Sequence, residues 1–141
     1  MAKVIVIKGA KDAGKTTAMR YILEVLIYLG AKVTHYKPYS KTYIYRGDFE
    51  AELELKGKTI AIRSMGDAPN AAPSYIKKHS SKNIVIVATR NEPDFTDRIG
   101  LNSDTLWFDK DLDLSKSYED QYNELGNFVR KVVGQILSLI P

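Results

Sequence analysis

The spacing of apolar and polar residues predicts a chain that begins with strand, turn and helix. Val and Ile fill residues 3–8 and 83–90 with little alternation, which favours parallel strands buried on both faces. After the first run, apolar residues recur every three or four positions from Met19 to Leu29, and Gly30 stands where a helix C-cap glycine is expected. With a second strand at residues 32–36, the first 37 residues are predicted to form one βαβ unit.

The middle of the chain changes to strict alternation. Phe49, Ala51, Leu53 and Leu55 alternate with glutamates, which predicts a strand with one buried face. Residues 56–57 then turn the chain into the apolar run 59–62, so we predict a β-hairpin inserted into, or joined to the edge of, a parallel sheet. Residues 42–46 and 104–109 are candidates for two further short strands. Pro73 suits the first position of a short helix that runs to about His79.

The last third of the chain carries the clearest helix pattern. Apolar residues follow a three- and four-residue rhythm from Tyr118 to Ile140, and Ser117 can cap the first turn, where Glu119 and Asp120 face the positive end of the helix. We therefore predict a single α/β domain over residues 1–141. Its three layers should contain a mainly parallel five-stranded sheet with a β-hairpin insertion.

Composition narrows the class of protein. The 141 residues are 44% hydrophobic, which is sufficient for one buried core, and no apolar run approaches the ~20 residues needed to cross a bilayer. We therefore expect a soluble, cytoplasmic protein with no membrane partner. There is no cysteine, and His35 and His79 are far apart in sequence, which argues against disulfide bonds and thiolate metal sites. A net charge of +4 favours anionic partners, which could be nucleotides or nucleic acid, or it serves solubility alone, and the charge does not distinguish these alternatives.

One short motif gives the site its predicted chemistry. Residues 9–16, Gly-Ala-Lys-Asp-Ala-Gly-Lys-Thr, fit the pattern G-x-x-x-x-G-K-[ST] at every fixed position, between a buried strand and an amphipathic helix. A short loop in this context can point consecutive backbone N–H groups inward, and its glycines allow phosphate oxygens to approach closely. The helix adds its positive end. On these residues the chain resembles the P-loop NTPase superfamily.

The resemblance implies the three-layer P-loop fold and Mg²⁺-dependent binding of a nucleoside triphosphate. It implies that Lys15 reaches the β- and γ-phosphates and that the Thr16 hydroxyl ligates Mg²⁺. ATP is the expected nucleotide from its frequency across the superfamily, although Asn91 and Asp94 have the spacing of a guanine-reading motif, with Glu92 in place of its lysine. The predicted nucleotide-binding residues are Gly9, Lys11, Asp12, Ala13, Gly14, Lys15, Thr16 and Thr17.

The resemblance also implies a Walker B acid and cations near the γ-phosphate. Asp67 is the first candidate for this acid, and it would hold the metal together with Thr16. It follows the apolar run 59–62, although residues 63–66 intervene. Asp12 is the second candidate acid. Arg90 is the last residue of a predicted strand and Arg98 follows it, at the edge where open α/β sheets bind ligands. Lys15, Asp67, Arg90 and Arg98 are therefore the predicted catalytic residues.

Three functions are compatible with these residues. The first is phosphoryl transfer from ATP to water or to a small acceptor. The second is a non-catalytic nucleotide sensor or partner-binding module. The third is a nucleic-acid-associated ATPase, since residues 36–46 interleave tyrosines with cations, a composition typical of single-stranded nucleic-acid surfaces. These are Tyr36, Tyr39, Tyr43 and Tyr45 with Lys37, Lys41 and Arg46. The oligomeric state stays open.

Overall fold

The computed structural model describes residues 2–42, 44–100 and 104–140, which form an α/β fold. The described part of the chain contains six strands in one sheet and four helices. In chain order the elements are β1 (Lys3–Gly9), α1 (Lys15–Tyr28), β2 (Lys32–Pro38), β3 (Phe49–Leu55), β4 (Lys58–Arg63), α2 (Ala71–Lys78), β5 (Ile84–Arg90), α3 (Pro93–Ile99), β6 (Thr105–Asp109) and α4 (Tyr118–Ser138).

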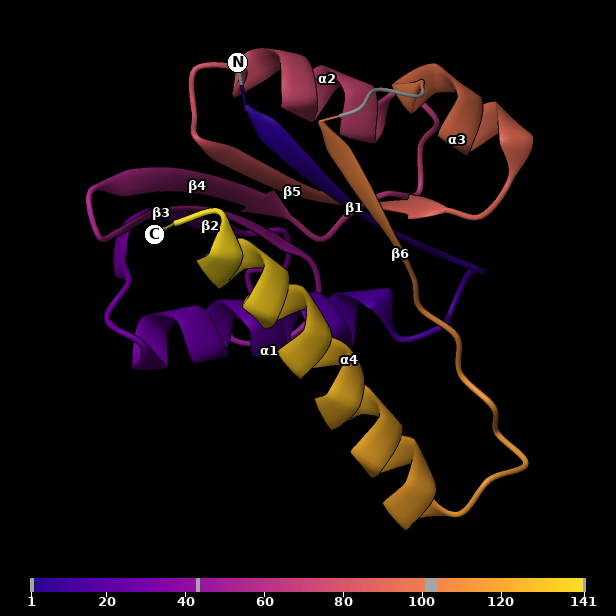
Figure 1. Cartoon of the computed structure of the whole chain (residues 1–141). Helices are drawn as coiled ribbons and strands as arrows, with labels where there is room; N and C mark the ends of the chain where they lie inside the picture. Colours follow the sequence, from indigo (N-terminus) through magenta and orange to yellow (C-terminus); the bar gives the residue numbers. More distant parts are fainter. Residues whose placement is uncertain (1, 43, 101–103, 141) are drawn as a thin grey trace.

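The helices cover both faces of the sheet, which gives three layers. Figure 1 shows α1 and α4 on one face and α2 and α3 on the other. Because successive strand residues point to opposite faces, Ile5 and Ile7 of β1 belong to the core beneath α1 and α4, whereas Val4 and Val6 belong to the core beneath α2. The two-sided burial explains why β1 and β5 are almost continuously apolar.

The sheet is mixed, so the prediction of a mainly parallel five-stranded sheet was wrong. The strand order is β2-β3-β4-β5-β1-β6; β4, β5, β1 and β6 pair in parallel, whereas β3 pairs antiparallel with both β2 and β4. The predicted hairpin is confirmed as β3 and β4, joined at Lys56 and Gly57, which both have positive φ. The hairpin lies inside the sheet, between β2 and β5, so β1 and β2 are not neighbours.

The helices match their predictions to different degrees. In α4 the predicted cap is confirmed, because the Asp120 N–H donates to the Ser117 hydroxyl at 3.1 Å. Helix α2 begins at Ala71, two residues before Pro73, and α3 was not predicted. Residues 42 and 44–46 form no strand, and Tyr43 lies outside the described residues. In the described chain, no helix is long and apolar enough to cross a membrane.

Candidate functional site

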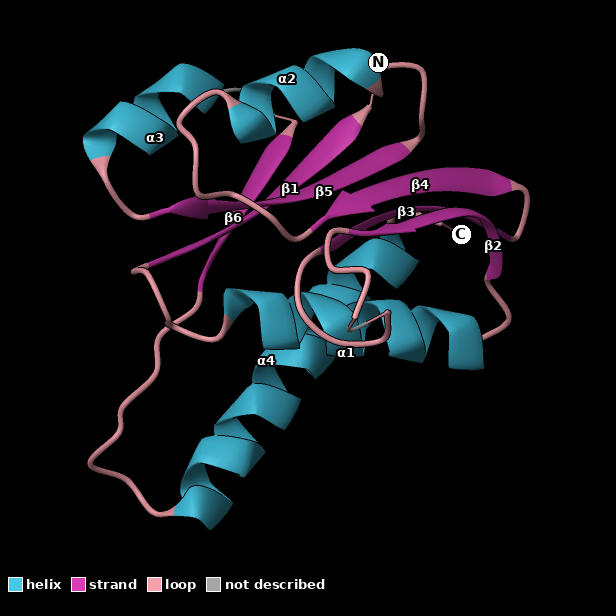
Figure 2. Ribbon diagram, turned by 180° about the vertical axis from the view of Figure 1, so that it is seen from behind, coloured by secondary structure: helices cyan, strands magenta, loops and turns pink. Residues whose placement is uncertain are grey.

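The loop between β1 and α1, residues 10–14, lies at the carboxyl edge of the parallel strands (Figure 2). Gly14 has a φ of +83° and is the N-cap of α1, and no described side chain caps the first turn of that helix. A Cβ at Gly9 would lie 2.3 Å from the backbone oxygen of Lys110, so no other residue fits there without a backbone shift. The backbone geometry therefore requires glycine at position 9 and favours it at position 14.

Lys15 folds back over the loop that precedes it. Its Nζ donates to the backbone oxygens of Gly9 at 2.8 Å and Ala10 at 2.7 Å. Burial lowers the pKa of Lys15 below its ordinary value, and the nearby Asp67 carboxylate opposes that shift. The two carbonyls hold the ammonium group at the loop, where it adds to the positive end of α1.

A carboxylate outside the predicted site contacts Thr16. The Thr16 hydroxyl donates to Asp48 Oδ1 at 2.8 Å, and the hydroxyl of Ser64 donates to the same oxygen at 3.0 Å. Asp48 directly precedes β3, and buried Ser64 directly follows β4. Because β3 is antiparallel to β4, its start lies at the edge where β4 ends. The tripeptide at residues 46–48, which looks like an ordinary turn in the sequence, thus delivers an acid to the motif threonine.

The predicted acid, Asp67, approaches from a different direction. Its Oδ1 lies 3.5 Å from Nη2 of Arg90, at the end of β5. The loop after β4 reaches this place by crossing the end of β5, where a Cβ at Gly66 would lie 2.2 Å from the backbone oxygen of Ala88. Arg90 Nε is buried and has no hydrogen-bond partner among the described residues. The Asp67 carboxylate and the Arg90 guanidinium, which has one N–H group without a partner among the described residues, therefore lie beside the glycine loop.

These groups line one cleft of about 470 Å³. Its lining comprises Lys11, Asp12, Gly14, Lys15, Thr16, Thr17, Asp48, Ser64, Gly66, Asp67 and Leu112. Of the other predicted residues, Gly9 is the last residue of β1, Ala13 belongs to the loop, and Arg90 contacts Asp67 of the cleft. Arg98 is not brought to it, because its guanidinium donates to Asn70 Oδ1 at 2.8 Å and to the backbone of Asp94 at 3.0 Å.

A second cavity of about 290 Å³ adjoins the cleft and shares Gly14, Thr17 and Leu112 with it. It lies between α1 and α4, and its other lining residues are Tyr21, Lys110, Gln121, Tyr122 and Leu125. Lys110, also absent from the predicted site, is buried, and its Nζ donates to the backbone oxygens of Ala13 and Asp111. Burial lowers the pKa of Lys110 below its ordinary value. The lysine ties the end of β6 to the glycine loop.

The oxygen donors of the cleft suit a hard divalent cation. The Thr16 hydroxyl and the Asp48 carboxylate are adjacent, and Mg²⁺ commonly takes few protein ligands and completes its shell with water and phosphate oxygens. The described residues contain no cluster of three or more His, Cys, Asp and Glu side chains that could hold a metal ion. Thr16 and Asp48 provide a hydroxyl and a carboxylate that could ligate such a cation.

Comparison with known protein families, curated proteins and solved structures finds no match to this chain.

Proposed function

We propose that the chain is a P-loop NTPase that binds Mg²⁺ and a nucleoside triphosphate, ATP before GTP, and transfers the terminal phosphoryl group to water or a small acceptor. The observation that carries the proposal is the hydrogen bond between Thr16 and Asp48, in the same cleft as Lys15 and the glycine loop. An acid that precedes β3 is thereby brought to the motif lysine and threonine, which are adjacent at the start of α1. A chance occurrence of the motif gives no reason for this convergence.

The glycine loop and Lys15 would hold the phosphates. The backbone amides at the start of α1 and the positive end of the helix favour an anion. The Lys15 ammonium now donates to two neutral carbonyls, and hydrogen bonds between two charged groups are stronger than those to neutral acceptors. Phosphate oxygens are therefore better partners for this lysine than the carbonyls it contacts.

Thr16 and Asp48 would hold Mg²⁺, which when bound neutralises charge on the phosphates. Thr16 would be the direct ligand, and Asp48 would orient the hydroxyl and a water of the metal shell. Asp48 thereby takes the role that the sequence suggested for Asp67. We assign Asp67 a different role, which is to position Arg90 near the terminal phosphoryl group. The Arg90 guanidinium would stabilise the negative charge of the transition state.

The adjoining cavity would take the nucleoside. It is continuous with the phosphate cleft through Gly14, Thr17 and Leu112, and its walls include the rings of Tyr21 and Tyr122. Aromatic rings provide stacking surfaces for nucleobases. A triphosphate seated on the loop would therefore have space for its base between α1 and α4.

The proposal is tested by thermal shift with ATP, GTP and pyrophosphate in Mg²⁺. A ligand at 100 times its dissociation constant adds about 2.7 kcal/mol, which for a chain of this size raises the melting temperature by roughly 5–10 °C. Lys15→Ala should abolish the shift, whereas Lys58→Ala, an exposed lysine at the far end of β4, should preserve it. Phosphate release measured with the same samples separates an enzyme from a nucleotide sensor. No shift with any triphosphate refutes the proposal.

A further inference from the structure

The opposite edge of the sheet carries a row of lysines. Lys32 begins β2, Lys56 and Lys58 flank the hairpin turn, Lys82 precedes β5, and Lys3 begins β1. Neighbouring strands lie about 4.8 Å apart, so the row extends over about 20 Å. In Figure 1 the hairpin turn lies on the same side as the last turn of α2, which adds Lys77 and Lys78. We call these seven residues the lysine edge.

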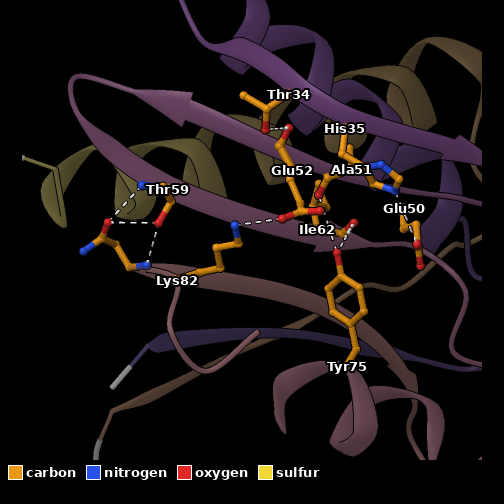
Figure 3. Close-up of polar contacts among 10 residues, drawn as sticks. Thr34, His35, Glu50, Ala51, Glu52, Thr59, Ile62, Tyr75 and Lys82 are labelled. Carbon is orange, nitrogen blue, oxygen red and sulfur yellow. Dashed lines mark hydrogen bonds and ion pairs between the residues drawn. The ribbon is translucent and has the colours of Figure 1, made fainter. Parts of the chain in front are cut away.

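Only part of the lysine edge is neutralised by ion pairs. Lys3 pairs with Asp104, and Lys82 pairs with Glu52 at 2.7 Å. Figure 3 shows the Lys82 side chain pointing to Glu52, beside the hydrogen bonds that join Thr59 to Asn83, the residue before β5. Glu54 is opposite Lys32 in the strand register, and Glu50 interacts electrostatically with Lys78. The lysines of the hairpin turn and of α2 are exposed.

The lysine edge is richer in basic than in acidic residues. It holds seven of the 21 lysines and arginines, and its neighbours Glu50, Glu52, Glu54 and Asp104 are four of the 17 acidic residues. The other fourteen basic residues are accompanied by thirteen acidic ones. Three of the four net positive charges therefore belong to the lysine edge and its neighbours.

An aromatic side chain stands at one end of the row. Tyr28, the last residue of α1, is 89% exposed, and only Gly30 and Ala31 with Leu29 separate it from Lys32. Because its side chain is largely open to solvent, it is available for stacking, and each stacked base contributes about 1–3 kcal/mol in single-strand complexes.

We propose that the lysine edge binds single-stranded nucleic acid, with phosphates along the lysines and a base on Tyr28. A linear series of point charges matches a linear polyanion better than it matches the plane of a lipid surface. The surface lies at the end of the strands away from the glycine loop, so the proposal does not depend on nucleotide binding. It is also distinct from the tyrosine and lysine segment at residues 36–46, which follows the other end of β2.

The test is fluorescence anisotropy of a labelled 12-nucleotide single strand, between about 25 and 200 mM salt, without nucleotide. For single strands the slope of log affinity against log salt is about −0.7 for each phosphate neutralised. The double variant Lys56→Gln with Lys58→Gln should make the slope shallower by about 1.4 and weaken binding roughly 10- to 100-fold at 50 mM salt. Tyr28→Ser should weaken binding about 5- to 100-fold without changing the slope.

The matched control is Lys37→Gln with Lys41→Gln, which removes the same charge near the opposite edge and should leave affinity and slope unchanged. Thermal melts of all variants confirm that they fold. Three results overturn the proposal: no binding at 25 mM salt, an equal loss in the control pair, or tighter binding to anionic phosphatidylglycerol vesicles than to the oligonucleotide. An affinity unchanged by Tyr28→Ser also contradicts it, because the base then stacks elsewhere or not at all.

Discussion

Replacing Asp48 by asparagine tests whether Asp48 or Asp67 is the acid of the proposed Mg²⁺ site. Asp48 Oδ1 accepts hydrogen bonds from the hydroxyls of Thr16 and Ser64, at 2.8 and 3.0 Å. The amide oxygen of asparagine can accept both bonds, so the variant should fold. Only the charge is lost, and hydrogen bonds to a charged group contribute about 1.5–3 kcal/mol. We therefore expect the apparent affinity for Mg²⁺ to fall about 10- to 150-fold.

The assay is a Mg²⁺ titration at a fixed concentration of a fluorescent ATP analogue. Asp48→Asn should move the midpoint to higher Mg²⁺, and enough Mg²⁺ should restore nucleotide binding. Asp67→Asn is the matched control, since it removes an identical charge from the same cleft. For that variant we expect a midpoint close to that of the unmodified protein and a slower release of phosphate.

The reverse pattern would refute the assignment. If Asp67→Asn moves the Mg²⁺ midpoint and Asp48→Asn does not, Asp67 is the metal acid, and the hydrogen bond between Thr16 and Asp48 is structural. A thermal melt of Asp48→Asn without ligand shows whether either result reflects a folding defect.

Three further predictions concern the loops around the cleft. Gly66→Ala should reduce the free energy of unfolding in urea by about 2–3 kcal/mol, because its Cβ would meet a backbone oxygen, whereas Gly134→Ala, with open space inside α4, should raise it by about 0.5–1 kcal/mol. Burial lowers the pKa of Lys110, so between that pKa and 10.5 the unfolded chain binds more protons than the folded chain. The free energy of unfolding should therefore rise with pH in this interval, and Lys110→Met should flatten the rise in urea melts at a series of pH values. Arg90→Gln should slow phosphate release about 100-fold with nucleotide affinity nearly unchanged, whereas Arg98→Gln should leave both intact.

Local patterns account for the elements that were predicted well. The apolar runs of β1 and β5 reflect burial on both faces, and the rhythm of α4 reflects one buried stripe containing Val129, Val132 and Ile136. Helix α3 was missed because its first turn, around Pro93 and Asp94, consists of residues that also form turns. Strand order depends on pairing between distant segments, and no local pattern specifies that the hairpin lies between β2 and β5.

The residues of the candidate site also differ in whether a local pattern predicts them. The glycine loop is contiguous, so its residues could be predicted from the motif, but Asp48, Ser64 and Lys110 reach it through long-range pairing. The position of Asp48 could have been predicted from the sequence, because an antiparallel hairpin that starts at Phe49 begins beside the end of its partner strand. Lys110 was not, since its position requires β6 to be the neighbour of β1.

The mixed sheet explains why two acids meet the cleft in different places. β5 separates β4 from β1, so the loop after β4 must cross β5 to reach the glycine loop, and Gly66 allows that crossing to be close. Asp67 therefore lies at the carboxyl end of β5, beside Arg90. The antiparallel β3 brings Asp48 to the same edge but on the side of α1, at Thr16. Because each acid is fixed to a different partner, loss of either charge should affect a different step, Mg²⁺ binding for Asp48 and phosphoryl transfer for Asp67.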